Sequence, residues 1–161
     1  MKWGIAALVS VLSLGAAGLA DAVEHRDRAS VRAMLDRRVD VNAPQVDGMT
    51  ALHWAAHHDD LETAERLVRA GANVKAANRY GVTPLSLACT NGDAALVKLL
   101  LEAGADANAA LPGGETVLMT AARTGRIAVV KALLERGADA KAKEGRRGQT
   151  ALMWAAAEGH A

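Results

Sequence analysis

The sequence predicts an all-α fold, a solenoid of stacked helix-turn-helix units with β-turn or hairpin fingers between them. A seven-residue pattern that begins at Thr50 returns at Thr83, Thr116 and Thr150, at intervals of 33, 33 and 34 residues. Self-similarity at such a period is typical of solenoids. The chain also has 37 Ala but no Phe, one Tyr and three Trp, which favours closely packed helices over sheets. A glycine keeps the same interval independently, at residues 71, 104 and 137.

The first element, residues 1–17, is expected to be a secretory signal peptide. Lys2 precedes the uncharged residues 5–14, and small residues follow from Gly15. A positive end, a short apolar stretch and a small-residue cleavage site define such a peptide. The apolar stretch is shorter than the ~20 residues that span a bilayer. Cleavage is therefore favoured over a membrane anchor, and no stable membrane span is expected afterwards.

The cleavage point follows from the repeat alignment. The small-residue pattern allows cleavage after Ala17, Ala20 or Ala22. Leu19 aligns with Leu52 of the next unit, and full burial of such a side chain is worth about 1.5–3 kcal/mol. Only cleavage after Ala17 keeps Leu19, so we expect the mature chain to begin at Gly18, with Ala22 as the latest alternative.

The charge balance excludes some classes of partner. The chain has 19 Lys and Arg against 18 Asp and Glu, and Lys2, in the signal segment, accounts for the difference. A chain without net charge is a poor binder of nucleic acid or of acidic membranes. Nucleic acid is therefore not expected as a partner.

Residues 18–47 form a degenerate N-terminal capping unit. Its apolar residues align with those of the next unit, at Leu19, Ala22, Val23, Val31, Met34 and Leu35. Arg28 replaces Leu61, as expected where the outer face of a terminal repeat meets water. Arg38 replaces Gly71 and is expected to carry about 1 kcal/mol of left-handed strain.

Residues 48–80, 81–113 and 114–147 form complete units. The threonine that opens each unit is expected to cap a first helix, and Pro84 is tolerated because its position needs no N–H. Aspartates are expected to cap the second helices, at Asp27, Asp60 and Asp93. The second helices have apolar residues with a helical period, at Leu61, Ala64, Leu67 and Val68, then Ala94, Val97, Leu100 and Leu101, then Ile127, Val130, Leu133 and Leu134. Gly71, Gly104 and Gly137 are expected to end these helices in the left-handed conformation.

Residues 148–161 form a partial unit with one helix. Leu152, Met153 and Trp154 are expected to lack packing partners on their outer side, with no polar cap. We interpret the sequence as a fragment of a longer array. The alternative is a short chain that dimerises through this end and is otherwise monomeric.

These units resemble the ankyrin repeat family. Its signature, Thr-Pro-Leu-His-x-Ala, is matched most closely by residues 50–56 and 83–89, and the resemblance covers essentially everything after the signal segment. It implies a non-catalytic module that binds another protein through its finger-like turns and the exposed face of the first helices. It also implies that His53 supports neighbouring turns through hydrogen bonds.

Solvent-facing positions that vary between units are the candidate binding residues. Tyr80 and Leu111 are expected to place apolar area at finger tips, as binding anchors do; the alternative is that they are ordinary loop residues. Lys143, Arg146 and Arg147 form a basic cluster that suits an acidic partner, unless it is only a solvated turn. The remaining candidates are Arg79, Pro112, His57, His58, Thr90, Asn91, Arg123 and Thr124.

No motif of a known catalytic or cofactor site is present. His53 and His57 share a helix face, as metal ligands do, but no further ligand has the right spacing. Cys89 replaces an alanine of the other units, so a buried small hydrophobe is expected rather than a nucleophile. We therefore expect no enzyme activity, no cofactor and no metal.

The sequence as a whole predicts an exported protein-interaction module, in the bacterial periplasm or secreted. The alternative is a recognition arm of a longer enzyme or membrane protein that extends beyond residue 161. The identity of the partner does not follow from the sequence.

Overall fold

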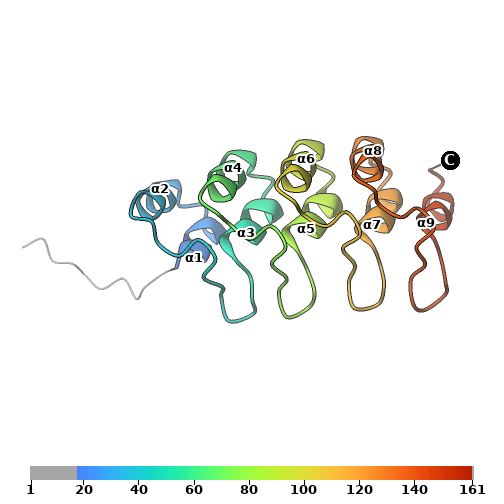
Figure 1. The fold of residues 1–161 in the computed structure, drawn as a ribbon, viewed down its shortest axis with the longest axis horizontal. Helices are drawn as coiled ribbons and strands as arrows, with labels where there is room; N and C mark the ends of the chain where they lie inside the picture. Colours follow the sequence, from blue (N-terminus) through green and yellow to red (C-terminus); the bar gives the residue numbers. More distant parts are fainter. Residues whose placement is uncertain (1–17, 161) are drawn as a thin grey trace, which may run out of the picture.

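The computed structural model describes residues 18–160, in which helices alternate between two layers (Figure 1). The first helices of the units form one layer: α1 (Leu19–Glu24), α3 (Ala51–His57), α5 (Pro84–Asn91), α7 (Val117–Arg123) and α9 (Ala151–Ala157). The second helices form the other: α2 (Arg28–Asp36), α4 (Leu61–Arg69), α6 (Ala94–Glu102) and α8 (Ile127–Glu135). Extended fingers project from the first layer, away from the second (Figure 1). The all-α solenoid is confirmed, and the described residues contain one isolated β-bridge, between Ala110 and Thr116.

Both predicted sets of helix caps are present. Among the threonines, Thr83 and Thr116 each accept the backbone N–H of the third helical residue at 3.2 Å. The hydroxyl of Thr50 lies instead 2.8 Å from Nδ1 of His53. Asp27 and Asp60 each accept a backbone N–H at 3.1 Å, and Asp93 caps α6 in the same way. These caps satisfy helix N–H groups that have no partner within the helix.

Left-handed residues end the second helices, as predicted. Gly71, Gly104 and Gly137 have φ values of 91°, 96° and 83°, and Arg38 has 54°. A second left-handed position, which was not predicted, lies in the turn between the two helices of a unit, where Arg26 and Asp59 have φ values of 56° and 54°. Glycines occupy that position in later units, at residues 92 and 125.

The core runs between the two layers and consists of small and aliphatic side chains. Ala55, Ala88 and Ala121 occupy equivalent positions in successive first helices and are fully buried. Their small volume allows the helices of neighbouring units to approach closely. Leu67 and Leu100 of the second helices are also fully buried and fill the space between the layers.

Two of the predicted core residues are exposed. Ile127 is 70% exposed and Leu134 is 44% exposed, although their counterparts in α6, Ala94 and Leu101, pack against the core. The difference arises because α8 contacts α6 on one side, whereas no second helix lies beyond it in residues 18–160. Val129, on the side of α8 that faces α6, is fully buried.

The N-terminal unit packs largely as predicted. Leu19 is 3% exposed and Val31 is 5% exposed, whereas Met34 and Leu35 are half-buried. Arg28 is exposed, as expected for an outer face. The proposed signal segment, residues 1–17, lies outside the described residues. Within the described part, no helix is long and apolar enough to cross a membrane.

The last helix, α9, has an open side. Leu152 is 77% exposed and Met153 is 52% exposed, as predicted, while Trp154 is half-buried. The indole of Trp154 has the guanidinium of Arg123 at 5.8 Å from the ring centre. Trp154 is more buried than its two neighbours because it lies on the side of α9 that faces α7.

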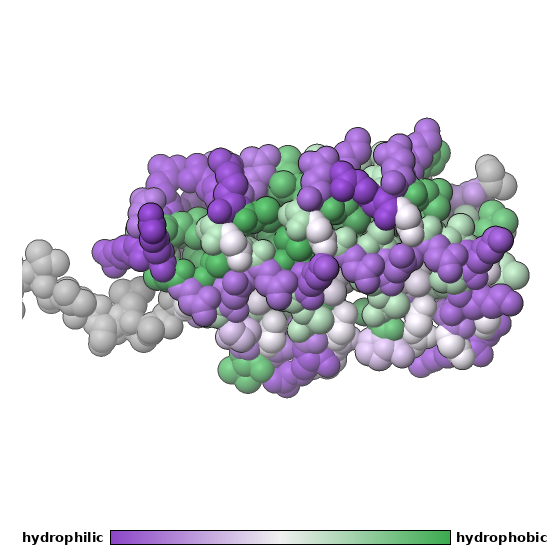
Figure 2. Space-filling model, viewed as in Figure 1, coloured by the Kyte–Doolittle hydropathy of each residue, from purple (hydrophilic) through white to green (hydrophobic). Residues whose placement is uncertain are grey.

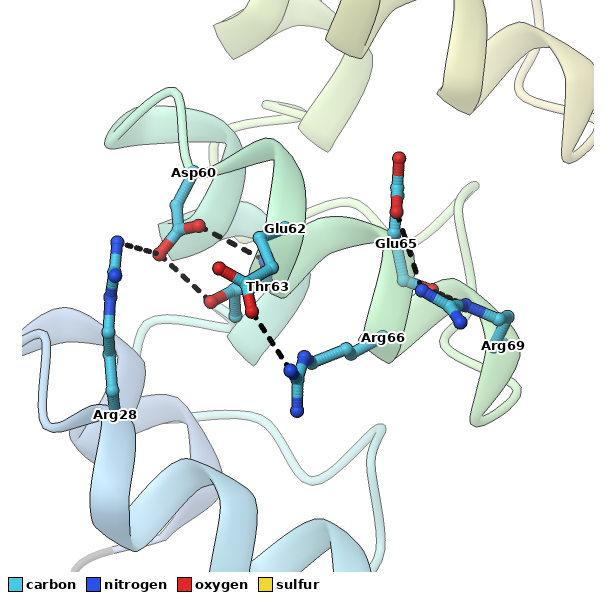
Figure 3. A network of polar contacts seen from close by, with 7 residues as sticks. All are labelled: Arg28, Asp60, Glu62, Thr63, Glu65, Arg66 and Arg69. Carbon is cyan, nitrogen blue, oxygen red and sulfur yellow. Dashed lines mark hydrogen bonds and ion pairs between the residues drawn. The ribbon is translucent and has the colours of Figure 1, made fainter.

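The outer face of the second helices carries surface ion pairs (Figure 3). Arg66 pairs with Glu62 at 2.9 Å and Arg69 with Glu65 at 3.3 Å, each four residues apart on α4. Arg28 lies 3.9 Å from Asp60, the residue that caps α4 (Figure 3). Exposed pairs of this kind contribute about 0–1 kcal/mol each, so this face is a solvated surface and not a site.

Candidate functional site

A groove runs along the solenoid between the first helices and the fingers, and we call it the finger groove. Residues 33 positions apart face it from successive first helices, because each unit repeats the same helix register. One such row consists of Glu24, His57, Thr90 and Arg123, and the parallel row consists of Asp21, Trp54, Leu87, Thr120 and Trp154. Three hollows lie along the groove, at its N-terminal end, its middle and its C-terminal end.

Polar side chains fold the finger tips by accepting backbone N–H groups. The amide oxygen of Asn78 accepts from Tyr80 at 2.9 Å and from Val82 at 3.0 Å. The carboxylate of Glu144 accepts from Arg146 and Arg147 at 2.6 Å and from Gln149 at 3.1 Å. These N–H groups favour the charged form, so the pKa of Glu144 lies below its ordinary value.

Backbone hydrogen bonds also join neighbouring fingers. The N–H of Arg79 donates to the carbonyl of Asp47 at 3.0 Å, and the N–H of Gly145 donates to that of Gly113 at 2.9 Å. The guanidinium of Arg79 donates to the carbonyl of Val46. These bonds couple the first finger to the second and the third finger to the fourth.

Most predicted binding residues lie exposed on the fingers or the first helices. Tyr80 is 63% exposed at a finger tip. The other exposed members are His57, Arg79, Thr90, Pro112, Arg123, Lys143, Arg146 and Arg147. Four members are only partly accessible: His58, Asn91, Leu111 and Thr124.

Leu111 is not the exposed tip residue that the sequence predicted. It occupies the position of Asn78 and Glu144 in the neighbouring fingers, at the base of the turn, and it lines the middle hollow. Its N–H donates to the carbonyl of Glu115 at 2.9 Å and closes the turn, as the N–H groups of Asn78 and Glu144 do in their fingers. The most exposed apolar finger residue is Val46, which is 95% exposed. The first finger also ends in a hydrophobic patch in Figure 2. Val46 was not among the predicted binding residues because it belongs to the degenerate unit.

His58 and Asn91 join adjacent units. Nε2 of His58 lies 3.0 Å from the carbonyl of Glu24, in the preceding unit. The amide nitrogen of Asn91 donates to the carbonyl of His57 at 3.0 Å and to the carboxylate of Asp59 at 2.9 Å. Both side chains therefore stabilise the stack, and their polar atoms are already engaged.

His53 is fully buried and holds the base of a finger. Nδ1 accepts the backbone N–H of Thr50 at 3.1 Å, and Nε2 lies 3.0 Å from the carbonyl of Val82 in the next unit. This pattern requires the neutral ring, with its proton on Nε2. Burial lowers the pKa of His53 below its ordinary value.

Cys89 is fully buried beneath the groove. Burial raises the pKa of the Cys89 thiol to about 12, which leaves no reactive thiolate near neutral pH. In residues 18–160, no group of three or more His, Cys, Asp or Glu side chains gathers as a metal site requires.

The N-terminal hollow has an acidic lining that the sequence analysis did not identify. The side-chain amide of Gln45 donates to Asp21 at 2.6 Å and to Glu24 at 2.7 Å. Its oxygen accepts from the indole N–H of Trp54 at 2.6 Å. The hydrogen bond from Gln45, followed by that from the N–H of Gly18, lowers the pKa of Asp21. The 33-residue spacing from His57 back to Glu24 is the sequence signal that could have revealed this cluster.

The C-terminal hollow has a basic rim. Arg146 and Arg147 line it together with Glu115, Glu144 and Trp154. Neither of these arginines has a side-chain partner within the described residues. The indole nitrogen of Trp154 is buried and has no hydrogen-bond partner there.

Comparison with protein families assigns the repeats. A family model described as ankyrin repeats (3 copies) matches residues 19–110 and 109–161. The two matches together extend over nearly all of the described chain. No curated protein matches the sequence.

Proposed function

The chain belongs to the ankyrin repeat family, and we propose that it binds a protein partner through the finger groove and the finger tips. The fold repeats its buried residues from unit to unit but varies the exposed row that faces the groove. Glu24, His57, Thr90 and Arg123 occupy equivalent positions and differ in charge. Variation in charge along an accessible face of a repeated frame supports recognition by that face.

Covalent capture tests this proposal. A photoreactive phenylalanine derivative is placed at position 90, where Thr90 is exposed in the groove, or at position 98, where Lys98 is exposed on the outer face of α6. Irradiation in the cells that produce the protein is expected to give adducts from position 90 only. Equal adducts from the two positions, or adducts from position 98 alone, refute binding in the groove.

The anchors can be tested separately. Tyr80 is the accessible aromatic residue at a finger tip, and Leu111 lines the groove. Replacement of both by Ser is expected to abolish partner capture while the helical content stays the same. Unchanged capture would show that the anchors lie elsewhere.

The chain is further proposed to have no catalytic activity of its own. Cys89 and His53, the two groups best suited to catalysis, both have structural roles. Cys89 is a buried neutral thiol, and both ring nitrogens of His53 lie at hydrogen-bond distance from neighbouring groups. The first-helix layer therefore offers binding groups and not a nucleophile with its base.

We also propose that the protein is exported, into the bacterial periplasm or the medium, and loses residues 1–17. The burial of Leu19 supports cleavage after Ala17, because a later cut would remove part of α1. The N–H of Gly18 donates to the carboxylate of Asp21 at 2.6 Å, so a new ammonium group at Gly18 would meet a negative charge. Intact-mass measurement of the exported protein is expected to give a chain that begins at Gly18; a start at Asp21 or Val23 refutes the packing argument.

A further inference from the structure

We propose that the finger groove binds an extended peptide that is basic at one end, carries an apolar side chain near its middle, and is acidic at the other end. This inference rests on the proposed function and specifies the chemistry of the partner. It follows from the different lining of the three hollows.

The N-terminal hollow suits a basic side chain. Asp21, Glu24 and Asp47 line it, and Arg79 is the one cation among its lining residues. Gly18 also lines the hollow, and its ammonium group in a chain cleaved after Ala17 adds a second positive charge, so the hollow keeps a net charge of −1 after cleavage. Gln45 donates to both Asp21 and Glu24, and because its amide is neutral it orients these carboxylates without cancelling their charge.

Trp54 adds an aromatic wall to the same hollow. Its indole N–H is satisfied by Gln45 at 2.6 Å, which holds the ring in place. A Lys or Arg side chain that enters this hollow can therefore contact carboxylates and an aromatic ring together. Carboxylates and aromatic rings each attract the cationic groups of arginine and lysine.

The middle hollow suits an apolar side chain. It encloses about 260 Å³. Val82, Leu87 and Leu111 supply aliphatic surface, and Thr83 and Thr90 supply hydroxyl groups. Only Glu115 and Arg123 carry charge among its lining residues, and they lie 4.0 Å apart as a pair.

The C-terminal hollow suits an acidic side chain. Arg146 and Arg147 are exposed on its rim. Glu115 and Glu144 balance the charge of these arginines, but the Glu144 carboxylate is buried against backbone N–H groups of its own turn, so an incoming group meets the exposed guanidinium groups first. The two guanidinium groups are therefore available to a carboxylate from outside, which Arg binds in a bidentate manner.

The unpaired indole of Trp154 indicates that this hollow lacks an acceptor. The equivalent Trp54 donates to Gln45, at the base of the preceding finger. Glu144 occupies the position of Gln45, but its oxygens face the finger backbone, and Nε1 of Trp154 has no partner in residues 18–160. An acidic or carbonyl group of a ligand, with a small rotation of the ring, would supply the missing acceptor.

The repeat spacing sets the length of the peptide. The outer hollows are three helix-to-helix steps apart, and such steps measure about 8–10 Å. The charged ends are therefore separated by about 24–30 Å. An extended chain advances about 3.3 Å per residue, so about eight residues lie between the basic and the acidic end.

Selection from twelve-residue random peptides displayed on phage tests the proposal on the full chain. The expected result is enrichment of peptides with basic and acidic ends about eight residues apart, as derived from the strand rise. Enrichment of peptides without this charge pattern refutes the inference and leaves the proposed function intact. An absence of any enrichment refutes both.

Charge-reversal variants of the protein show which end of the finger groove each part of the peptide contacts. The variant R146E/R147E is compared with K98E/K131E, which changes the net charge equally on the outer layer, where both lysines are exposed. An enriched peptide is expected to bind R146E/R147E at least about tenfold more weakly, the scale of one charged contact of about 1.4 kcal/mol, and K98E/K131E with unchanged affinity. Replacing the acidic residues of the peptide by lysine should restore binding to R146E/R147E.

A second variant keeps the test independent of that finger. E24K is expected to weaken the binding of the same peptide. Replacing the basic residues of the peptide by glutamate should restore its binding to E24K. Circular dichroism confirms that each variant folds. Equal binding to R146E/R147E and to its control, or an absence of rescue at both ends, refutes the charge assignment.

Discussion

Arg38 and Gly104 occupy the same left-handed turn in different units. Arg38→Gly and Gly104→Ala should therefore shift the stability of the protein in opposite directions. Arg38 has φ 54° and Gly104 has φ 96°. A Cβ atom added at Gly104 would meet no other atom within 4 Å. The side chain of Arg38 is exposed and makes no hydrogen bond or ion pair within residues 18–160. Both substitutions therefore change backbone conformational energy and little else.

The magnitude follows from two opposing terms. A side chain in the left-handed conformation costs about 1–2 kcal/mol, whereas glycine loses about 0.5–1 kcal/mol more entropy on folding. Arg38→Gly should therefore stabilise the protein by about 0.5–1 kcal/mol, the difference between these terms. For a chain of this size, that raises the melting temperature by about 1–4 °C. Gly104→Ala should lower it by a similar amount.

Thermal and urea unfolding, followed by circular dichroism, measure both variants. Asp59→Gly is the matched control, because Asp59 has the same φ of 54° but also accepts a hydrogen bond from Asn91 at 2.9 Å. Its gain should be smaller than that of Arg38→Gly, since the hydrogen bond is lost. A lower melting temperature for Arg38→Gly, or shifts of the same sign for Arg38→Gly and Gly104→Ala, would refute the reasoning.

Three further predictions concern pH and packing. The free energy of unfolding should fall as the pH drops below about 6.5. Unfolded His53 takes up a proton at its ordinary pKa of 6.5, whereas burial lowers that pKa in the folded state. Urea unfolding at several pH values should show that the free energy of unfolding decreases less with falling pH in His53→Gln than in the unmodified protein. Glu144 has a lowered pKa and an ordinary value of 4.5, so its contribution is present above pH 4.5 and is lost below; NMR of the Arg146 amide in acid should report the loosening of this finger, and an unchanged signal would contradict it. Leu100→Ala should cost about 2–5 kcal/mol in urea unfolding, whereas Leu152→Ala, at a side chain that is 77% exposed, should change stability by no more than about 0.5 kcal/mol.

The parts of the fold that the sequence predicted are those controlled by local backbone chemistry. A threonine or aspartate before a helix caps it through neighbouring N–H groups, and Thr83 and Asp60 do so here. A glycine after the helix adopts a conformation that other residues resist, as Gly104 does. These effects need only a few adjacent residues, so a repeating sequence reveals them directly.

The parts that it missed depend on neighbours in space. The helical period placed Ile127 on an apolar face, but burial also requires a helix on that side, and none lies there in the described residues. Leu111 was assigned to a tip because its finger is exposed, yet it is half-buried and lines the middle hollow. The cluster at Asp21 escaped notice because Gln45, which unites it, lies in another part of the same degenerate unit.

The same repeat that makes the fold predictable also determines how the surface can recognise a partner. Because each unit repeats one helix register, equivalent side chains form a straight row, and their order along the groove is their order in the sequence. That row changes from Glu24 through His57 and Thr90 to Arg123, so its charge runs from negative to positive along one axis. An extended peptide that lies along the groove would meet these charges in order, one unit after another. A gradient along a straight groove therefore selects for a linear ligand with the opposite gradient.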